Sequence, residues 1–377
     1  MSLEHVMVVA GEASGDRHAA DLVAELQRAR PELRFFGMGG AALAARGVDL
    51  LYSANEISVM GLTEVLPKLR RILQVLAGLT RAAARRRPRV AILVDVPDFN
   101  LRLARRLKAQ GVRVAYYVSP MVWASRPWRT RAIRRTVDRM LCILPFEEPF
   151  LRRSGIDARY VGNPVLEQVP DPAPPEEFRR RLGLSPGRPT LALLPGSRLG
   201  EIQRLLPAMV ETARTLALER PGLQVVVPVA STIDPAVVSA YFEGSGVSPV
   251  LVAGRAPEAV GASDVAVVAS GTAVLEAGLM QRPLVVVYRV SWLTYFVGKL
   301  LVRVAHIALV NLLANRRLVP ELLQGDLTPK RVLAEVRRLW EPGPARDEML
   351  AGLAEVQRTL GPKGAAARAA EEVLSLW

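Results

Sequence analysis

The sequence predicts an α/β protein with two Rossmann-like domains that face a central cleft. Short apolar runs alternate with segments of helical periodicity along the 377-residue chain, which is typical of βαβ units and a parallel sheet. The runs form two sets, separated by the proline-rich stretch VPDPAPPEEF, which has no apolar periodicity. A chain of this length also fits two domains of ordinary size.

Ten apolar runs predict the strands of the two domains. The first set comprises Val6–Ala10, Leu33–Gly37, Val90–Val94, Val112–Val118 and Met140–Leu144. The second set comprises Thr190–Leu194, Leu223–Val229, Val250–Ala253, Val265–Ala269 and Leu284–Tyr288. We expect domains over residues 1–168 and 169–344, and a C-terminal helical segment, 345–377, that packs back on the first domain. Because ligands of open α/β sheets bind at the carboxyl ends of the strands, the loops there are the candidate sites.

The composition narrows the classes of partner. Lys and Arg number 50 against 36 Asp and Glu, so the net charge of +14 favours a nucleic acid, an acidic membrane surface or a phosphorylated ligand. A single cysteine, Cys142, excludes an internal disulfide and a multi-cysteine metal site, and it fits a reducing compartment. Only three histidines argue against a His-rich metal centre. The N-terminus lacks a signal-peptide pattern, so we expect a cytoplasmic protein.

One segment, Ser291–Leu313, has the length of a membrane span. Its Lys299, Arg303 and His306 are spaced to share one helical face, which a lone spanning helix would expose to hydrocarbon. An interfacial helix would set these side chains against anionic headgroups. A buried helix of the globular fold, an interfacial helix and a span therefore remain as alternatives.

Two loops of the second half predict a nucleotide-sugar site. After the run that ends at Leu194, the PGSR turn places Ser197 and Arg198 before a helix, and amides and a guanidinium there suit a diphosphate. The alternative is an ordinary βα turn with a surface arginine. A second loop follows Ala269 and supplies Ser270, Gly271 and Thr272 for phosphate and, one helical turn later, Glu276 for a ribose diol; the alternative for Glu276 is a solvated helix residue.

The loops of the first half offer different chemistry. GEASGD, Gly11–Asp16, lacks both the GxGxxG spacing and the ending of a P-loop, so neither dinucleotide nor ATP binding is indicated. Gly39 and Gly40 are either turn residues or lie close to a ligand. The DVPDFN motif places Asp95, Asp98 and Asn100 after a strand, where Asp98 suits either a general base or a helix N-cap. No DxD motif is present, so we expect no metal and no cofactor.

A segment that interleaves tryptophan with arginine follows the fourth run. Trp123 and Trp128 alternate there with five arginines, a composition that suits a membrane–water interface or single-stranded nucleic acid. The alternative is a solvated helix face with two core tryptophans.

Taken in order, these motifs resemble the bacterial lipid-A-disaccharide synthase family, inverting glycosyltransferases of the B-type two-Rossmann fold. The resemblance covers nearly the whole chain. It rests on GEASGD, GMGG, DVPDFN, YYVSP with VWA, VGNP, LLPGSR with EI, SGTA with LEA, the N-L-L of Asn311–Leu313, and PELLQ at Pro320–Gln324. The sequence departs from the family's usual residues at Val310, where proline is usual, at Asn315, where glycine is common, and at Met121 and Ser125.

The resemblance implies an activity and a role for each candidate residue. Family members transfer 2,3-diacylglucosamine from its UDP donor to 2,3-diacylglucosamine 1-phosphate, which forms a β-1,6 bond and releases UDP. Asp98 would be the base for the acceptor hydroxyl. The UDP group would be Ser197, Arg198, Ser270, Gly271, Thr272 and Glu276, and the substrate-lining group would be Ser14, Gly15, Gly39, Gly40 and Asn311.

The resemblance also implies where the enzyme works. Both substrates are acylated, so we expect a peripheral enzyme on the anionic inner face of the cytoplasmic membrane and no nucleic-acid partner. The oligomeric state, monomer or homodimer, stays open. Two other functions remain as alternatives: another UDP-sugar enzyme of this fold, such as an epimerase or a peptidoglycan-type transferase, and a non-catalytic basic protein that binds membranes.

Overall fold

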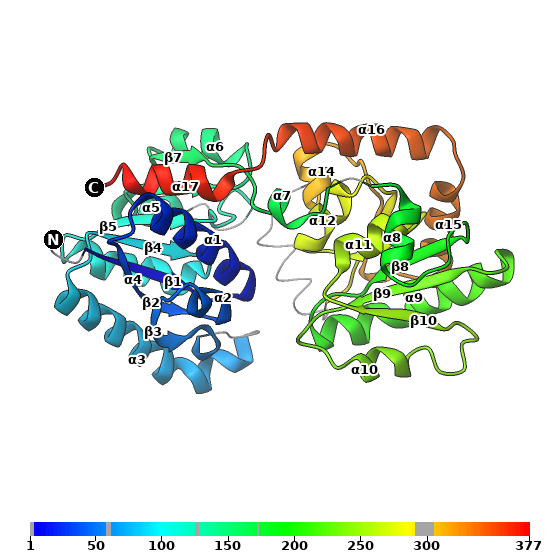
Figure 1. Cartoon of the computed structure of the whole chain (residues 1–377), viewed down its shortest axis with the longest axis horizontal. Coiled ribbons are helices and arrows are strands. Elements are labelled where there is room, and N and C mark those ends of the chain that lie inside the picture. Colours follow the sequence, from blue (N-terminus) through cyan, green and yellow to red (C-terminus); the bar gives the residue numbers. More distant parts are fainter. Residues whose placement is uncertain (1–3, 58–61, 125–127, 172, 291–304) are drawn as a thin grey trace. The chain divides into compact units, whose positions relative to one another are not determined.

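The computed structural model describes residues 4–57, 62–124, 128–171, 173–290 and 305–377. The chain divides into two compact units, one of Met1–Pro164 with Pro362–Trp377 and the other of Val165–Gly361. Each unit is a parallel sheet covered by helices (Figure 1).

The first unit has a seven-stranded sheet in the order β3-β2-β1-β4-β5-β6-β7, and every described pair of neighbours is parallel. This order is that of a doubly wound Rossmann sheet. The strands are β1 (His5–Ala10), β2 (Arg34–Gly39), β3 (Asp49–Ser53), β4 (Val90–Val94), β5 (Arg113–Tyr117), β6 (Arg139–Cys142) and β7 (Ala158–Tyr160). The helices are α1 (Ala13–Ala29), α2 (Ala41–Ala45), α3 (Leu62–Arg86), α4 (Pro97–Lys108), α5 (Arg129–Thr136), α6 (Glu147–Arg153) and α17 (Ala365–Leu374).

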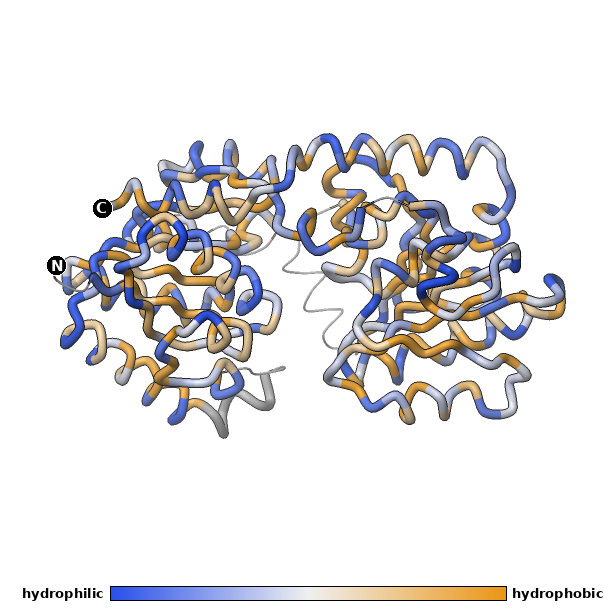
Figure 2. The backbone as a smooth tube through the Cα atoms, viewed as in Figure 1, coloured by the Kyte–Doolittle hydropathy of each residue, from blue (hydrophilic) through white to orange (hydrophobic). Residues whose placement is uncertain are grey.

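Both faces of this sheet are buried, which explains why its central strands are continuous apolar runs. Along β1, Val6 and Val8 face the core that α1, α2 and α17 cover, whereas Met7 and Val9 face the core under α3 to α6. Hydrophobic residues follow the strands in Figure 2. Because α17 packs against α1 and β6, the end of the chain completes the first of these cores.

The second unit repeats the same winding with a six-stranded sheet in the order β10-β9-β8-β11-β12-β13, again parallel throughout its described pairs. The strands are β8 (Thr190–Leu194), β9 (Gln224–Val229), β10 (Pro249–Ala253), β11 (Val265–Ala269), β12 (Leu284–Tyr288) and β13 (Glu321–Leu323). The helices are α7 (Val165–Gln168), α8 (Pro175–Arg181), α9 (Leu199–Glu219), α10 (Pro235–Ala240), α11 (Ala256–Ala262), α12 (Thr272–Leu279), α14 (Leu309–Ala314), α15 (Pro329–Trp340) and α16 (Pro344–Thr359).

The predicted α/β class with two Rossmann-like domains is confirmed, and each predicted apolar run overlaps an observed strand. The sequence analysis missed β3, β7 and β13. Each of these is an edge strand with one neighbour, so it needs no long apolar run. The C-terminal segment expected over 345–377 is divided between the units, since α16 belongs to the second and α17 to the first.

Within the described ranges, no helix has the length and apolar character required to cross a bilayer. Most of the segment Ser291–Leu313 lies outside these ranges, as do Ser125 and Arg126 of the tryptophan–arginine segment.

Candidate active site

The winding of each sheet determines which loops can form a site. In the first unit the chain leaves β1 toward β2 on one side and later returns to β4 on the other, so the loops after β1 and β4 border the switch point of the sheet. In the second unit the loops after β8 and β11 hold the same position. The GEASGD, DVPDFN, PGSR and SGT motifs all lie in these four loops or at the start of the helices that follow them.

The first turn of α1 packs on the end of β4. Helix α1 begins at Ala13, so Ser14 and Gly15 lie in its first turn rather than in a loop. A Cβ added at Gly15 would stand 2.5 Å from Oδ2 of Asp95. Gly15 is therefore needed for the close approach of this helix to the Asp95 carboxylate.

The turn that carries Asp95 is strained and firmly held. Asp95 and Val96 have φ angles of 53° and 40°, in the left-handed region, which a β-branched residue such as valine rarely adopts. The buried Asn100 donates from Nδ2 to the carbonyl oxygens of Val94 (2.9 Å) and Asp95 (2.7 Å), and the Tyr116 hydroxyl donates to the Asp95 carbonyl (2.6 Å). Strain that surrounding contacts maintain in this way is common at active sites.

The surroundings of Asp95 favour its protonated form. Burial, and to a smaller extent the Glu12 carboxylate, raise the pKa of Asp95 from its usual 3.8 to about 7. A carboxylate with a pKa near neutrality is matched to general-base catalysis at neutral pH.

Asp98 has a different environment. It lies in the first turn of α4, its side chain is 65% exposed, and it forms an ion pair with Arg129 at the start of α5. The N-cap of α4 is Val96, so Asp98 does not have the capping role that the sequence analysis considered as an alternative.

The glycines of the GMGG motif lie against Asp16. The buried Asp16 accepts hydrogen bonds from the amides of Gly40 (2.6 Å) and Ala42 (2.9 Å), which connects α1 to the start of α2. A Cβ at Gly40 would stand 2.7 Å from Asp16 Oδ2. Close packing explains why residue 40 is a glycine, and its amide already donates to Asp16.

The tryptophan–arginine segment divides into a packed part and an exposed part. Trp123 donates from Nε1 to the buried Glu147 (3.1 Å) and packs edge-on to Phe146. Burial raises the pKa of Glu147 to about 7 although Trp123 and nearby amides bond to its carboxylate. Trp128, in contrast, is 62% exposed. The alternative of two core tryptophans is therefore wrong for Trp128.

The PGSR loop carries its own carboxylate. Helix α9 begins at Leu199 directly after Arg198, and Glu201 in its first turn accepts hydrogen bonds from the Ser197 amide (3.1 Å) and the Arg198 guanidinium (3.0 Å). The Thr232 hydroxyl donates to the Ser197 carbonyl (2.8 Å), which connects this loop to the end of β9. Sequence reasoning missed both Glu201 and Thr232.

The neighbouring SGT loop presents an exposed helix start. Ser270 follows β11, Gly271 is the N-cap of α12, and Gly271 and Thr272 are exposed. The helix has no side-chain cap, so its first amides are available to an anion. Glu276 lies one turn further along and is half-buried.

Tyr288 is a further residue of this region that the sequence analysis did not select. It ends β12, the strand beside β11. Burial and then the Glu201 carboxylate raise its pKa, whereas Arg198 and Arg204 oppose that shift. Tyr288 therefore lies within electrostatic reach of the PGSR group.

Asn311 is fully buried and saturated with protein hydrogen bonds. Its Nδ2 donates to the Val319 carbonyl (3.0 Å) and to Glu321 (2.7 Å), and its Oδ1 accepts from the amides of Leu318 and Val319, both at 2.8 Å. In this structure the side chain of Asn311 organises the chain between α14 and β13 and presents no free group to a ligand.

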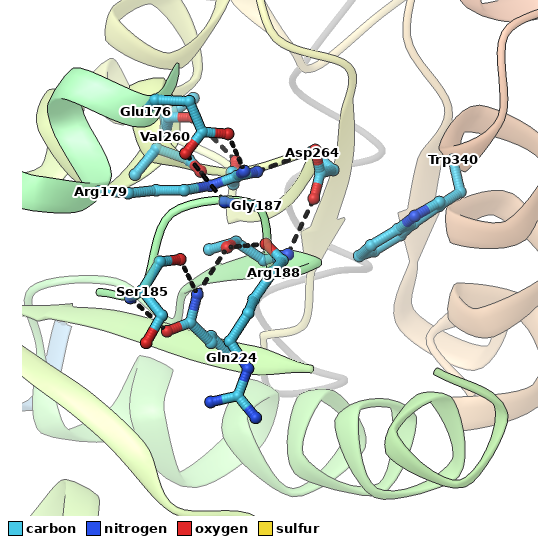
Figure 3. Close-up of polar contacts among 12 residues, drawn as sticks. Glu176, Arg179, Ser185, Gly187, Arg188, Gln224, Val260, Asp264 and Trp340 are labelled. Atoms are coloured by element: carbon cyan, nitrogen blue, oxygen red, sulfur yellow. Dashed lines mark hydrogen bonds and ion pairs between the residues drawn. The ribbon is translucent and has the colours of Figure 1, made fainter. Parts of the chain in front are cut away.

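A second charged cluster lies at the amino-terminal ends of β8 and β11, opposite the loops described above (Figure 3). The buried Arg179 donates to Glu176 (2.7 Å), to Asp264 (3.0 Å) and to the Ala262 carbonyl (2.9 Å), while Asp264 also accepts from the Thr190 amide (2.8 Å). These contacts attach α8 to the sheet. Because this cluster lies away from the carboxyl ends of the strands, where ligands of such sheets bind, we assign it a structural role.

Comparison with known proteins gives a family match over most of the chain. The family model for lipid-A-disaccharide synthetase matches residues 6–349. The lipid-A-disaccharide synthase of Myxococcus xanthus strain DK1622 is 69% identical over 98% of this chain and 97% of its own length. That of Anaeromyxobacter dehalogenans strain 2CP-1 is 54% identical over 99% and 97%.

Solved structures show the same fold at low identity. The UDP-GlcNAc 2-epimerase of Neisseria meningitidis bound to UDP-GlcNAc aligns with a TM-score of 0.64, 13% identity and 98% of each chain. The calicheamicin glycosyltransferase CalG4 aligns with a TM-score of 0.63, 16% identity, 100% of this chain and 98% of its own. The family model and the close relatives together span nearly the whole sequence, and the chain therefore belongs to the lipid-A-disaccharide synthetase family.

Proposed function

We propose that this chain transfers 2,3-diacylglucosamine from UDP to the 6-hydroxyl of 2,3-diacylglucosamine 1-phosphate, with inversion to a β-1,6 bond. The observation that carries the proposal is the family match over residues 6–349, with a 69% identical lipid-A-disaccharide synthase. The candidate residues at both switch points support it, because a base and a diphosphate site are the two parts that the reaction requires.

The acceptor hydroxyl must lose a proton as it attacks, and two carboxylates are candidates for the base. The resemblance assigns this role to Asp98, whereas the half-buried position, strained turn and raised pKa favour Asp95. We therefore propose Asp95 as the base. Asp98, paired with Arg129, would then help to hold α4 and α5 together and remains the alternative base.

The leaving UDP needs stabilisation of negative charge. We assign the diphosphate to Ser197 and Arg198 and to the start of α12 with Ser270, Gly271 and Thr272, and the ribose to Glu276. A guanidinium and helix amides can stabilise charge on the leaving group without a metal ion. In a single displacement the base acts on one side of the anomeric carbon while UDP leaves from the other.

The remaining candidates fall into two kinds. We propose that Ser14 and Gly15, beside Asp95, contact the substrate through the first turn of α1. Gly39 and Gly40 would act by allowing Asp16 to join the two loops, and Asn311 by positioning the segment that ends at Glu321. The contacts of these three residues support a positioning role more directly than a role in substrate binding.

We further propose that the first unit docks on the anionic inner face of the cytoplasmic membrane. On α3, Leu69 and Leu73 are 41% and 50% exposed beside the exposed Arg70. Trp128 is exposed at the start of the arginine-rich helix α5. Apolar side chains next to arginines suit the boundary between acyl chains and anionic headgroups.

A reconstitution assay tests the proposed reaction. The purified chain is incubated with UDP-2,3-diacylglucosamine, with and without the 1-phosphate acceptor, and disaccharide and UDP are measured by mass spectrometry. We expect both products only when donor and acceptor are present. UDP release or sugar epimerisation without acceptor would favour another UDP-sugar enzyme, and no turnover with vesicle binding alone would favour a non-catalytic membrane protein.

A further inference from the structure

Glu201 occupies the groups to which the UDP diphosphate is assigned. Its two carboxylate oxygens accept from the Ser197 amide at 3.1 Å and from the Arg198 guanidinium at 3.0 Å. Its side chain is 16% exposed, compared with 55% for Arg198. A carboxylate that takes one backbone N–H and one guanidinium resembles a phosphate in both charge and hydrogen bonding.

The backbone of the loop makes room for this carboxylate. Gly196 has a φ of 105°, and a Cβ at that position would overlap Glu201 Oε2. Glycine therefore serves twice at this position, because it adopts the left-handed conformation and leaves space for an anion beside it. The start of α9 adds to the attraction, since the N-terminal end of a helix carries partial positive charge.

We propose that Glu201 competes with the diphosphate for the Ser197 amide and the Arg198 guanidinium. When neither UDP nor the UDP-sugar is bound, the Glu201 carboxylate occupies both groups. This inference rests on the proposed function, because it takes Ser197 and Arg198 as diphosphate ligands. The Ser197 amide has a single hydrogen to donate, so it cannot bond to Glu201 and to the diphosphate at once. The two anions would also repel each other beside Arg198, so Glu201 must turn away when the nucleotide binds. The same competition returns Glu201 to the loop as UDP leaves and so speeds product release.

The alternative is that Glu201 only organises the loop as a helix-capping carboxylate. The two roles differ in the sign of their effect on UDP affinity. A competitor weakens binding, so that its removal tightens it; an organiser strengthens binding, so that its removal weakens it. If Glu201 is a competitor, its removal should tighten the binding of UDP but not of uridine, because uridine has no phosphate that displaces the carboxylate.

The test compares UDP and uridine binding by calorimetry in the wild-type chain and in Glu201→Gln, with dissociation rates from stopped flow. Glutamine retains an oxygen that can accept from the Ser197 amide, but it has no charge for Arg198. We expect Glu201→Gln to bind UDP roughly tenfold more tightly, mainly through slower dissociation, with uridine affinity unchanged. Glu211→Gln is the matched control, because Glu211 forms the same type of i,i+3 pair with Arg214 further along α9.

The outcomes separate this inference from the proposed function. If Glu201→Gln binds UDP no more tightly than wild type, the competitor role is wrong. If Arg198→Ala binds UDP as well as wild type does, the proposed diphosphate site itself fails. Should Glu201→Gln not fold, Glu201→Asp replaces it, since the shorter carboxylate cannot reach both groups and should also tighten UDP binding; equal or weaker binding there overturns the proposal.

Discussion

The Asp95 carboxylate lies directly against the Cα of Gly15, so that an added methyl group would stand 2.5 Å from Asp95 Oδ2. This contact joins the ends of β1 and β4, the two strands that border the switch point of the first sheet. It also places the first turn of α1 over a carboxylate whose pKa is about 7.

Gly15→Ala should therefore impair activity far more than a glycine substitution elsewhere. The methyl group has to displace Asp95 or α1, so we expect at least a tenfold loss of kcat with a folded protein. Gly325→Ala is the control, because a Cβ there meets nothing within 4 Å. Equal activities of the two variants in the disaccharide assay would show that the contact between Gly15 and Asp95 is not important for catalysis.

Paired substitutions distinguish the two candidate bases. Asp95→Asn should lower kcat by about 10²–10⁴-fold, the usual contribution of a general base, because the amide cannot accept the proton. Asp98→Asn should lose much less, since it removes only an exposed ion pair with Arg129. Circular dichroism and thermal unfolding verify the fold of both variants. The reverse order of activities would make Asp98 the base, as the resemblance implies.

The pH–rate profile should report the protonation of Asp95. Since the base acts only when ionised, kcat/KM should fall as the pH decreases through about 7. Asp98→Asn should keep this profile. A profile that stays flat from pH 6 to pH 8 would exclude a base of this pKa, if chemistry limits the rate.

The same group makes stability depend on pH. The pKa of Asp95 is higher in the folded protein than its usual 3.8, so the folded state binds more protons between about pH 4 and 7. Its contribution to stability is therefore lost as the pH rises through that window. Asp95→Asn should gain stability relative to wild type as the pH rises through this window, by about 4 kcal/mol at most. Denaturant unfolding at pH 5 and pH 8 measures the difference.

Asn311→Ala tests the positioning role of Asn311. The change removes four hydrogen bonds, three of them buried and one, to Glu321, partly buried, so we expect a loss of about 2–4 kcal/mol in the free energy of unfolding. Asn315→Gly is the control, because Asn315 has a φ of 50° that glycine adopts at least as easily. If Asn311→Ala instead kept its melting temperature and only raised KM, a direct substrate contact would be the better explanation.

Membrane docking should depend on the exposed leucines of α3. The double substitution Leu69→Gln with Leu73→Gln should weaken binding to vesicles that contain phosphatidylglycerol by roughly tenfold, because two apolar side chains no longer enter the interface. Leu218→Gln on α9 is the control, since Leu218 is even more exposed, at 77%. Equal binding of the double variant and this control in a flotation assay would exclude docking through α3.

Asn315 shows that a residue that departs from the family pattern can still meet the same structural requirement. Asn315, at a position where glycine is common, ends α14 in the left-handed conformation. Asparagine tolerates this conformation better than most residues, so the helix ends as it would with glycine. The requirement at this position is a backbone angle, which residue type alone indicates only indirectly.

The sequence by itself determined the doubly wound class, the central strands and the position of the candidate motifs in the loops after those strands. Central parallel strands are buried on both faces, and a continuous apolar run records that burial locally. The glycines and polar residues after each run mark where this burial ends, and so mark the ends of the strands. Only the short edge strands β3, β7 and β13, which lack this burial, were not visible in the pattern.

Tertiary structure alone decided how the charged groups of each loop are buried and paired. Asp95 and Asp98 are three residues apart and identical in type, yet one packs on Gly15 and the other points to Arg129 and solvent. Glu201 reads as an ordinary helix residue until its carboxylate is found on the PGSR loop. Burial and neighbouring charge set the pKa values and pairings of these groups, and both depend on residues that are distant in the sequence.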